Sequence, residues 1–218
     1  TSILNIPTAA SMNLTGDIGG ANKRTLNNVT VNNAGTFNYG STGDDNLRLT
    51  GGTVFNNLAT GLFDFQTTSP IQTTGTATLN NFNEVRVSSG GLSAINAGIS
   101  FNTNTGALLD IQTGSTLQLL GGGTFNGAQT VNGTLQLTTG TYDISDGSVF
   151  TGNLAVNGST LNLIGDFTLD TLNLSTGIIN LNSGGAGGGD TLNFTTALNW
   201  SNGSSINGNI AETSILNI

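Results

Sequence analysis

Short stretches in which apolar and polar residues alternate recur through the second half of the chain at nearly constant spacing. An apolar–polar–apolar triplet begins at Leu117, Leu135, Leu154, Leu172 and Leu192, so the steps in the numbering are 18, 19, 18 and 20. A second series begins at Tyr142, Leu161, Ile179 and Leu198, with steps of 19, 18 and 19. A looser third series passes through Val131, Val149 and Phe167, again in steps of 18. Alternation with a period of two predicts β-strands with one buried face, three in each period.

Three strands in each period of about 18–19 residues predict a coil that returns to its starting point. One coil cannot bury its own apolar residues, so the coils must stack, and the fold class is an all-β parallel β-helix (β-solenoid). Extrapolated backward from Leu117, the rhythm continues less regularly, in steps of 16 to 20, through Ile99, Leu79, Phe63, Leu47, Val29 and Met12. This predicts about 11–12 coils of roughly 18–19 residues. At about 4.8 Å per strand, the rod would be roughly 50–60 Å long. No segment has helical periodicity, so we expect essentially no helix.

The composition fits strands and tight corners and excludes several function classes. Only 7% of the residues are charged, and Gly, Asn and Thr are abundant. Neither Cys nor His is present, which excludes disulfides, thiolate metal sites and Ser–His or Cys–His nucleophiles. A net charge of −8 with four Lys plus Arg argues against nucleic-acid binding. No apolar run is long enough to span a bilayer, so we expect no insertion into a membrane.

The same hexapeptide occurs at both ends of the sequence. Its two copies are Thr1, Ser2, Ile3, Leu4, Asn5, Ile6 and Thr213, Ser214, Ile215, Leu216, Asn217, Ile218. This match predicts that residues 1–212 form one β-solenoid repeat unit and that residues 213–218 begin the next tandem repeat. The alternatives are coincidence, or related coils within one finite domain. Neither end has an amphipathic helix or charged cap, so we expect the hexapeptides to form a head-to-tail interface between copies. Whether the copies belong to one giant chain or to separate subunits stays open.

Segments such as Asn132-Gly133-Thr134-Leu135-Gln136-Leu137 combine an Asn-Gly corner with a Leu-x-Leu strand, and residues 157–163 repeat this arrangement. In this respect the chain resembles large bacterial surface adhesins of the filamentous-haemagglutinin or autotransporter-passenger type. The resemblance implies a right-handed β-helix, export to the cell surface, and a structural, non-enzymatic role as a filament, stalk or adhesin shaft. It leaves open a surface glycan or host receptor as a partner.

The alternative function is a carbohydrate-active β-helix, either a polysaccharide lyase or hydrolase or a glycan-binding module. Its candidate residues are Asp44, Asp45 and Arg48, with Arg86 about two predicted coils away. Carboxylates and a basic side chain on one face of the rod would supply acid–base groups. The competing interpretation is a charged corner in which Arg48 balances two carboxylates.

Two acidic groups are candidates for Ca²⁺, which prefers oxygen ligands. One comprises Asp143, Asp146, Asp166 and Asp170, spaced about one coil apart. Solvated residues at strand edges are the simpler interpretation of these four. The other is Asp190, in the glycine-rich segment 184–194, which resembles a calcium-binding nonapeptide. Extra glycines put that segment out of register, and a corner insertion is the alternative. No other cofactor is predicted.

Overall fold

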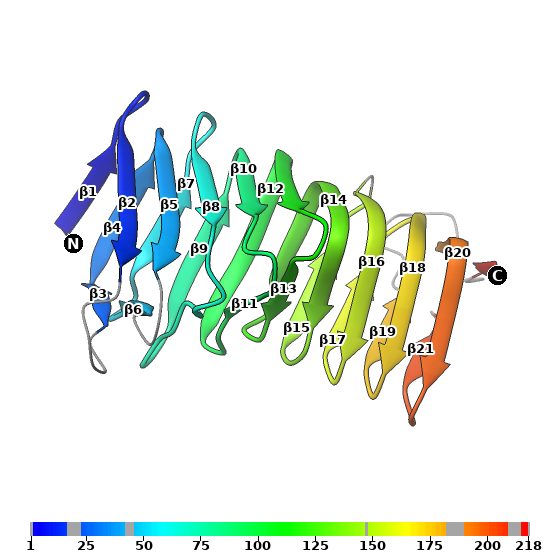
Figure 1. Cartoon of the computed structure of the whole chain (residues 1–218). Helices are drawn as coiled ribbons and strands as arrows, with labels where there is room; N and C mark the ends of the chain where they lie inside the picture. Colours follow the sequence, from blue (N-terminus) through cyan, green and yellow to red (C-terminus); the bar gives the residue numbers. More distant parts are fainter. Residues whose placement is uncertain are drawn as a thin grey trace.

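The computed structural model describes residues 2–16, 23–41, 46–146, 148–181, 190–208 and 215–217. These residues form 22 strands and no helix, and every pairing between two of the strands is parallel. The strands stack into a single β-solenoid, which runs from the N-terminus to the C-terminus as an elongated rod (Figure 1). The prediction of an all-β parallel solenoid is therefore confirmed. The described residues contain no helix that is long and apolar enough to cross a lipid bilayer.

Each turn of the solenoid contributes strands to three faces. The first face consists of β1 (Ser2–Ile6), β4 (Val29–Asn33), β7 (Val54–Asn57), β9 (Ala77–Asn81), the first parts of β12 (Ile99–Ile111) and β14 (Gly123–Leu137), β15 (Thr141–Ile144), β17 (Thr160–Leu163), β19 (Ile178–Leu181) and β21 (Ser205–Asn207).

The second face consists of β2 (Ser11–Gly16), β5 (Thr36–Ser41), β8 (Leu62–Phe65), β10 (Glu84–Val87), the later part of β12, the middle of β14, the first parts of β16 (Val149–Asn157), β18 (Phe167–Ser175) and β20 (Thr191–Ser201), and β22 (Ile215–Asn217). The third face consists of β3 (Arg24–Asn27), β6 (Leu47–Thr50), β11 (Leu92–Ile95), β13 (Thr116–Leu119) and the last parts of β14, β16, β18 and β20.

The predicted number of coils is wrong, because the turns of the first half are longer than those of the second. On the first face, Asn56 lies 24 positions after its partner Asn32 and 24 before Asn80. Asn162, by contrast, follows its partner Asp143 by 19. In the described part of the chain, eight turns have a strand on all three faces, and in one further turn only the bridge residues Ile71 and Gln72 reach the third face. With about nine axial steps of ~4.8 Å, the rod is roughly 45 Å long.

The backward extrapolation failed because it combined residues of different faces. Phe63 stacks between Phe37 and Val85 on the second face, whereas Leu79 lies on the first face. In the second half the first series is correct, since Leu117, Leu135, Leu154 and Leu172 stack in order. Its next member is Leu198 rather than Leu192, because the following turn is longer, with a step of 27 from Asn180 to Asn207.

The core is a set of apolar columns that run along the rod. Its first half contains a cluster of aromatic rings: those of Phe37, Phe55 and Phe63 lie with centroids 4.8–5.0 Å apart and are fully buried. The hydroxyl of Tyr39 donates to the Pro70 carbonyl oxygen and accepts from the Leu47 N–H, both at 3.0 Å. Among the described residues, the buried apolar side chains that follow Phe167 are all aliphatic.

Candidate functional site

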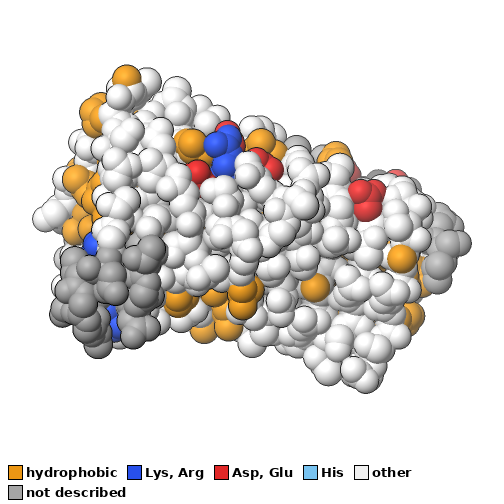
Figure 2. Space-filling model, in the orientation of Figure 1, with side chains coloured by type: hydrophobic (Ala, Val, Ile, Leu, Met, Phe, Trp, Pro, Cys, Tyr) orange, Lys and Arg blue, Asp and Glu red, His pale blue; other side chains and the backbone are white. Residues whose placement is uncertain are grey.

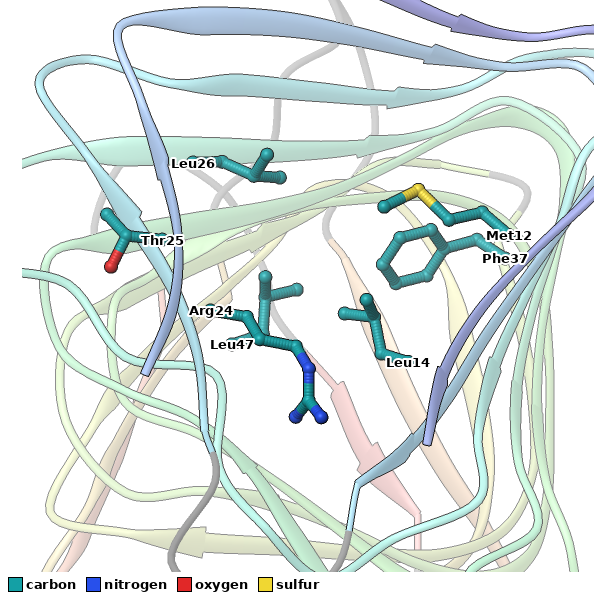
Figure 3. A pocket seen from close by; sticks show the side chains of 7 residues that line it. All are labelled: Met12, Leu14, Arg24, Thr25, Leu26, Phe37 and Leu47. Carbon is teal, nitrogen blue, oxygen red and sulfur yellow. The ribbon is translucent and has the colours of Figure 1, made fainter. Parts of the chain in front are cut away.

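The first turn leaves part of the core accessible at the N-terminal end of the rod. We call the outer edges of β1, β2 and β3 the N-terminal end surface. A pocket of about 300 Å³ opens here (Figure 3), lined by Met12, Leu14, Arg24, Thr25, Leu26, Phe37 and Leu47. Its lining is mainly apolar because β2 and β3 turn their core-facing side chains toward a space that a further turn would fill.

Arg24 places a cation in this apolar pocket. It pairs with the core residue Leu47, and its side chain points into the space beside Leu14 (Figure 3). Its Nη2 donates to the carbonyl oxygens of Thr15 at 2.9 Å and Gly16 at 3.4 Å. These bonds tie β3 to the end of β2 and fix the position of the guanidinium.

The C-terminal end surface is formed by the outer edges of β21, β22 and the last part of β20. Trp200 is the largest apolar side chain there and is 50% exposed, although it pairs with the fully buried Leu174. Its indole Nε1 donates to the Ser204 carbonyl oxygen at 3.2 Å. Leu198, Ile206 and Leu216 also pack against the core and are only partly buried. Both ends therefore present core side chains.

The two copies of the hexapeptide occupy different faces. β1 pairs with β4 on the first face, whereas β22 pairs with the first part of β20 on the second. Leu4 and Leu216 nevertheless have the same orientation, since both pack against the core. Thr1, Thr213, Ser214 and Ile218 lie outside the described residues, so the interface role of the full hexapeptides and the division at residue 212 stay predictions.

An outer asparagine ladder runs along the first face. It comprises Asn5, Asn32, Asn56, Asn80, Asn102, Thr124, Asp143, Asn162, Asn180 and Asn207, one from each successive turn. Each asparagine after Asn5 donates its Nδ2 to the side-chain oxygen one turn earlier at 2.7–3.1 Å. Thr124 interrupts this geometry, and its hydroxyl donates to Asn102 Oδ1 at 3.3 Å. The ladder links successive turns from β1 to the turn of Thr124, and again from β15 to β21.

An inner asparagine ladder lies at the corner between the first and second faces. Asn33 donates to Asn57 Oδ1 at 2.8 Å, and Asn57 donates to Asn81 Oδ1 at 2.9 Å. All three side chains are fully buried. Their amides also bind the corner carbonyls, among them that of Leu62, so they fix the shape of the corner in three successive turns.

A charged stack occupies the second face at the middle of the rod. Arg86 stacks between Asp64 and Asp110 and contacts Glu84 on its own strand, with Nη2–Oε1 at 2.5 Å and Nε–Oδ2 of Asp110 at 3.6 Å. Asp64 is 6% exposed and accepts from Ser88 Oγ at 2.7 Å. Figure 2 shows basic and acidic side chains gathered at this part of the surface. The sequence contained a signal for this stack, namely charged residues at intervals of 22 and 24, but the assumed shorter period hid it.

The predicted grouping of Arg86 with Arg48 is wrong. Arg48 lies on the third face, in β6, and Arg86 lies on the second, in β10. Asp44 and Asp45 lie outside the described residues, so the rest of that predicted corner is untested.

Three of the four aspartates of the first predicted calcium group have separate roles, and the fourth, Asp146, is exposed. Asp143 belongs to the outer asparagine ladder, and Asp166 accepts the Thr191 N–H at 2.9 Å. Asp170 accepts the Gly152 N–H at 2.8 Å and the Thr195 hydroxyl at 2.7 Å. Among the described residues, no three carboxylates come together in a way that could hold a metal ion.

Asp190 is 3% exposed, and its Oδ1 accepts the Gly165 N–H at 3.1 Å, which links two successive turns. Residues 184–189 of the predicted nonapeptide lie outside the described part of the chain. A calcium ion at Asp190 therefore stays a prediction.

No protein family, no curated protein and no solved structure matches the chain. The resemblance to bacterial surface adhesins therefore rests on the repeated segments of the sequence alone.

Proposed function

We propose that this protein is a structural unit of an extracellular bacterial filament, stalk or adhesin shaft, and that its copies assemble head to tail along the solenoid axis. The observation that carries the proposal is that both end surfaces expose apolar side chains of the core. The N-terminal end surface has an apolar pocket, and the C-terminal end surface has Trp200 half exposed beside Leu198, Ile206 and Leu216. Strand edges and core side chains at both ends of a solenoid favour the addition of a further solenoid.

The body of the rod suits a mechanical role. The backbone ladders join each turn to the next, and the outer asparagine ladder adds a side-chain hydrogen bond at most of these steps. Because the bonds of one step lie side by side, they share a load along the axis. Such ladders of stacked amides are also a stabilising feature of cross-β assemblies. An extracellular location is part of the proposal and is supported by the scarcity of charge and the absence of Cys.

A carbohydrate-active role is the second candidate, and the charged stack is the observation that favours it. Glu84 and Asp110, both partly exposed, and the buried Asp64 surround Arg86 on the second face, and a pair of carboxylates is what the hydrolysis of a glycan uses. Two of these carboxylates contact Arg86, which is the arrangement of a neutralised cluster. We therefore place this role second. Glycan-array binding that is lost in Glu84→Gln would favour it over the shaft.

Electron microscopy of the purified protein tests the shaft. We expect continuous fibres with an axial repeat of about 45 Å, the length of one rod at ~4.8 Å per turn. Ile206→Asp puts a charge on the C-terminal end surface and should abolish the fibres, whereas Gln118→Asp, on the outside of β13, is the matched control and should leave them intact. Discrete closed particles at high protein concentration would refute the proposal.

A further inference from the structure

The C-terminal copy of the hexapeptide shows a second place in which the sequence of β1 can stack. β1 pairs with β4 on the first face, whereas β22, whose residues repeat those of β1, pairs with the first part of β20 on the second face. Leu216 pairs there with the fully buried Leu192 and packs against the core, as its counterpart Leu4 does in β1. The β1 strand of another copy therefore fits the place that β22 occupies.

A copy whose β1 lies in that place is rotated by one face relative to the copy before it. Its next two strands then lie on the third face, where the last described strand is the final part of β20, and on the first face, where it is β21. We propose that the copies join in this way: β1 of the following copy takes the place of β22, its β2 stacks on the last part of β20, and its β3 stacks on β21. This inference rests on the proposed head-to-tail assembly and specifies its contacts.

β2 matches the last part of β20 position by position. Met12 and Leu14 alternate with outward residues and pack against the core at the N-terminal end surface, where they line the pocket (Figure 3). Leu198 and Trp200 have the same spacing at the C-terminal end surface, and Trp200 is 50% exposed. In the proposed join Met12 covers Leu198 and Leu14 covers Trp200, so apolar side chains at both ends are removed from water.

β3 matches β21 in the same manner. In Thr25-Leu26-Asn27 and in Ser205-Ile206-Asn207, a hydroxyl, an aliphatic and an amide side chain follow one another. Leu26 and Ile206 both pack against the core and are only partly buried, and in the join each covers the other. Arg24 keeps its hydrogen bonds to the carbonyl oxygens at the end of β2, because those carbonyls belong to its own copy.

The amide ladders have a direction that suits a head-to-tail join. Asn38 donates its Nδ2 to Asn13 Oδ1 at 2.6 Å, and Asn199 donates to the ladder residue one turn earlier at 2.8 Å. In the described part of the chain, Asn13 Nδ2 therefore has no acceptor and Asn199 Oδ1 has no donor. The same holds for the Nδ2 of Asn27 and the Oδ1 of Asn207. The join brings each of these donors to one of these acceptors.

The join suits both one long chain and separate copies. In one long chain β22 is itself the β1 strand of the following unit. Between separate copies, β1 of the incoming copy must displace β22. Because the two strands have the same sequence, the incoming Leu4 restores the contacts of Leu216, and β2 and β3 add contacts that β22 alone does not make.

Introduced cysteines test the join, because the sequence has none of its own. Parallel strands lie about 4.8 Å apart, so a short bifunctional thiol reagent bridges cysteines that stack on neighbouring strands. We would combine Asn207→Cys with Asn27→Cys, Asn13→Cys or Asn5→Cys in three variants, all at exposed positions. Asn27→Cys reports the proposed join, Asn13→Cys reports a join in which β2 lies on β21, and Asn5→Cys reports a join without rotation.

We expect the reagent to convert fibres of the Asn27→Cys variant into covalent chains, with loss of the monomer band on a denaturing gel. The monomer band should persist in the other two variants, which serve as matched controls. A variant that lacks residues 213–218 gives a second readout. Without a strand to displace, it should form fibres at a lower critical concentration than wild type, and a higher one would overturn the proposed join.

The remaining outcomes separate this join from the shaft itself. If wild type forms no fibres, the shaft is refuted. If fibres form and the reagent bridges the Asn13→Cys or the Asn5→Cys variant instead, or bridges none of the three, the shaft stands and the rotated join is refuted.

Discussion

The inner asparagine ladder predicts that neighbouring asparagines on one strand differ sharply in their contribution to stability. Asn57 and Asn56 are both members of ladders in β7, but Asn57 is fully buried and Asn56 is partly exposed on the outer face. We therefore compare Asn57→Ala with Asn56→Ala, two changes of the same size at adjacent positions.

The expected cost follows from the hydrogen bonds that each side chain makes. The Asn57 amide accepts from Asn33 at 2.8 Å, and its two N–H protons serve three nearby oxygens, those of Asn81, Gly61 and Glu84, at 2.8–3.1 Å. At most three bonds form at once. With about 1 kcal/mol for each buried hydrogen bond, Asn57→Ala should lower the free energy of unfolding by about 3 kcal/mol.

Two compensations limit this cost. Asn33 keeps its bond to the Leu62 carbonyl at 2.9 Å, and Asn81 Oδ1 keeps the Asn83 N–H at 3.2 Å, so neither amide is left wholly unpaired. In Asn56→Ala, water replaces the lost outer bonds, and the expected cost is about 0.5–1 kcal/mol.

The assay is reversible guanidinium unfolding followed by far-ultraviolet circular dichroism. Trp200 fluorescence, from the opposite end of the rod, serves as a second probe, since coincident transitions show that the rod unfolds as one unit. Equal losses of stability in the two variants would refute this expectation, because they would show that burial does not determine how much a ladder amide contributes to the free energy of unfolding.

Three further predictions concern a glycine, an ion pair and a tyrosine. In Gly152→Ala the new Cβ would lie 1.7 Å from the Val131 carbonyl oxygen, so unfolding followed by circular dichroism should show a severe loss of stability. Gly114→Ala is the control: Gly114 also has a positive φ but faces open space, so the change should lower the free energy of unfolding by only about 1 kcal/mol. Arg86→Gln should cost about 1 kcal/mol at low ionic strength and progressively less in salt titrations; a cost independent of salt would contradict the role given to its ion pairs. Desolvation, opposed by a smaller effect of a backbone hydrogen bond, raises the pKa of Tyr142 from 10.0 to about 12. The neutral, buried hydroxyl of Tyr142 therefore contributes about 2–3 kcal/mol to the free energy of unfolding below pH 10, and this contribution is lost as the pH rises toward 12. Unfolding curves of Tyr142→Phe, measured over this pH range, should lack that part of the alkaline loss of stability.

Local alternation was enough to predict strands, and a constant interval between them was enough to predict a solenoid. The interval is most nearly constant where the corners are short, as from Leu117 to Leu172, and there the sequence also predicted which residues stack. In the first half the step between stacked partners lengthens to 24, and alternation does not say to which face a triplet belongs. Phe63 and Leu79 have equivalent local patterns, yet they lie on different faces.

The candidate sites depended on the length of each turn and were therefore harder to predict. The charged stack forms because Asp64, Arg86 and Asp110 are each one turn apart, and a wrong period instead associated Arg86 with Arg48. The identical hexapeptides were visible in the sequence, but their positions on different faces were not.

The sequence by itself determined that this protein is an all-β solenoid with amide-rich turns, because strand alternation and turn residues act over a few neighbouring residues. Only the tertiary structure decided which residues share a column, because that depends on the length of every corner between them. Leu172, for example, stacks on Leu198 and not on Leu192, because the turn between them is longer than those before it.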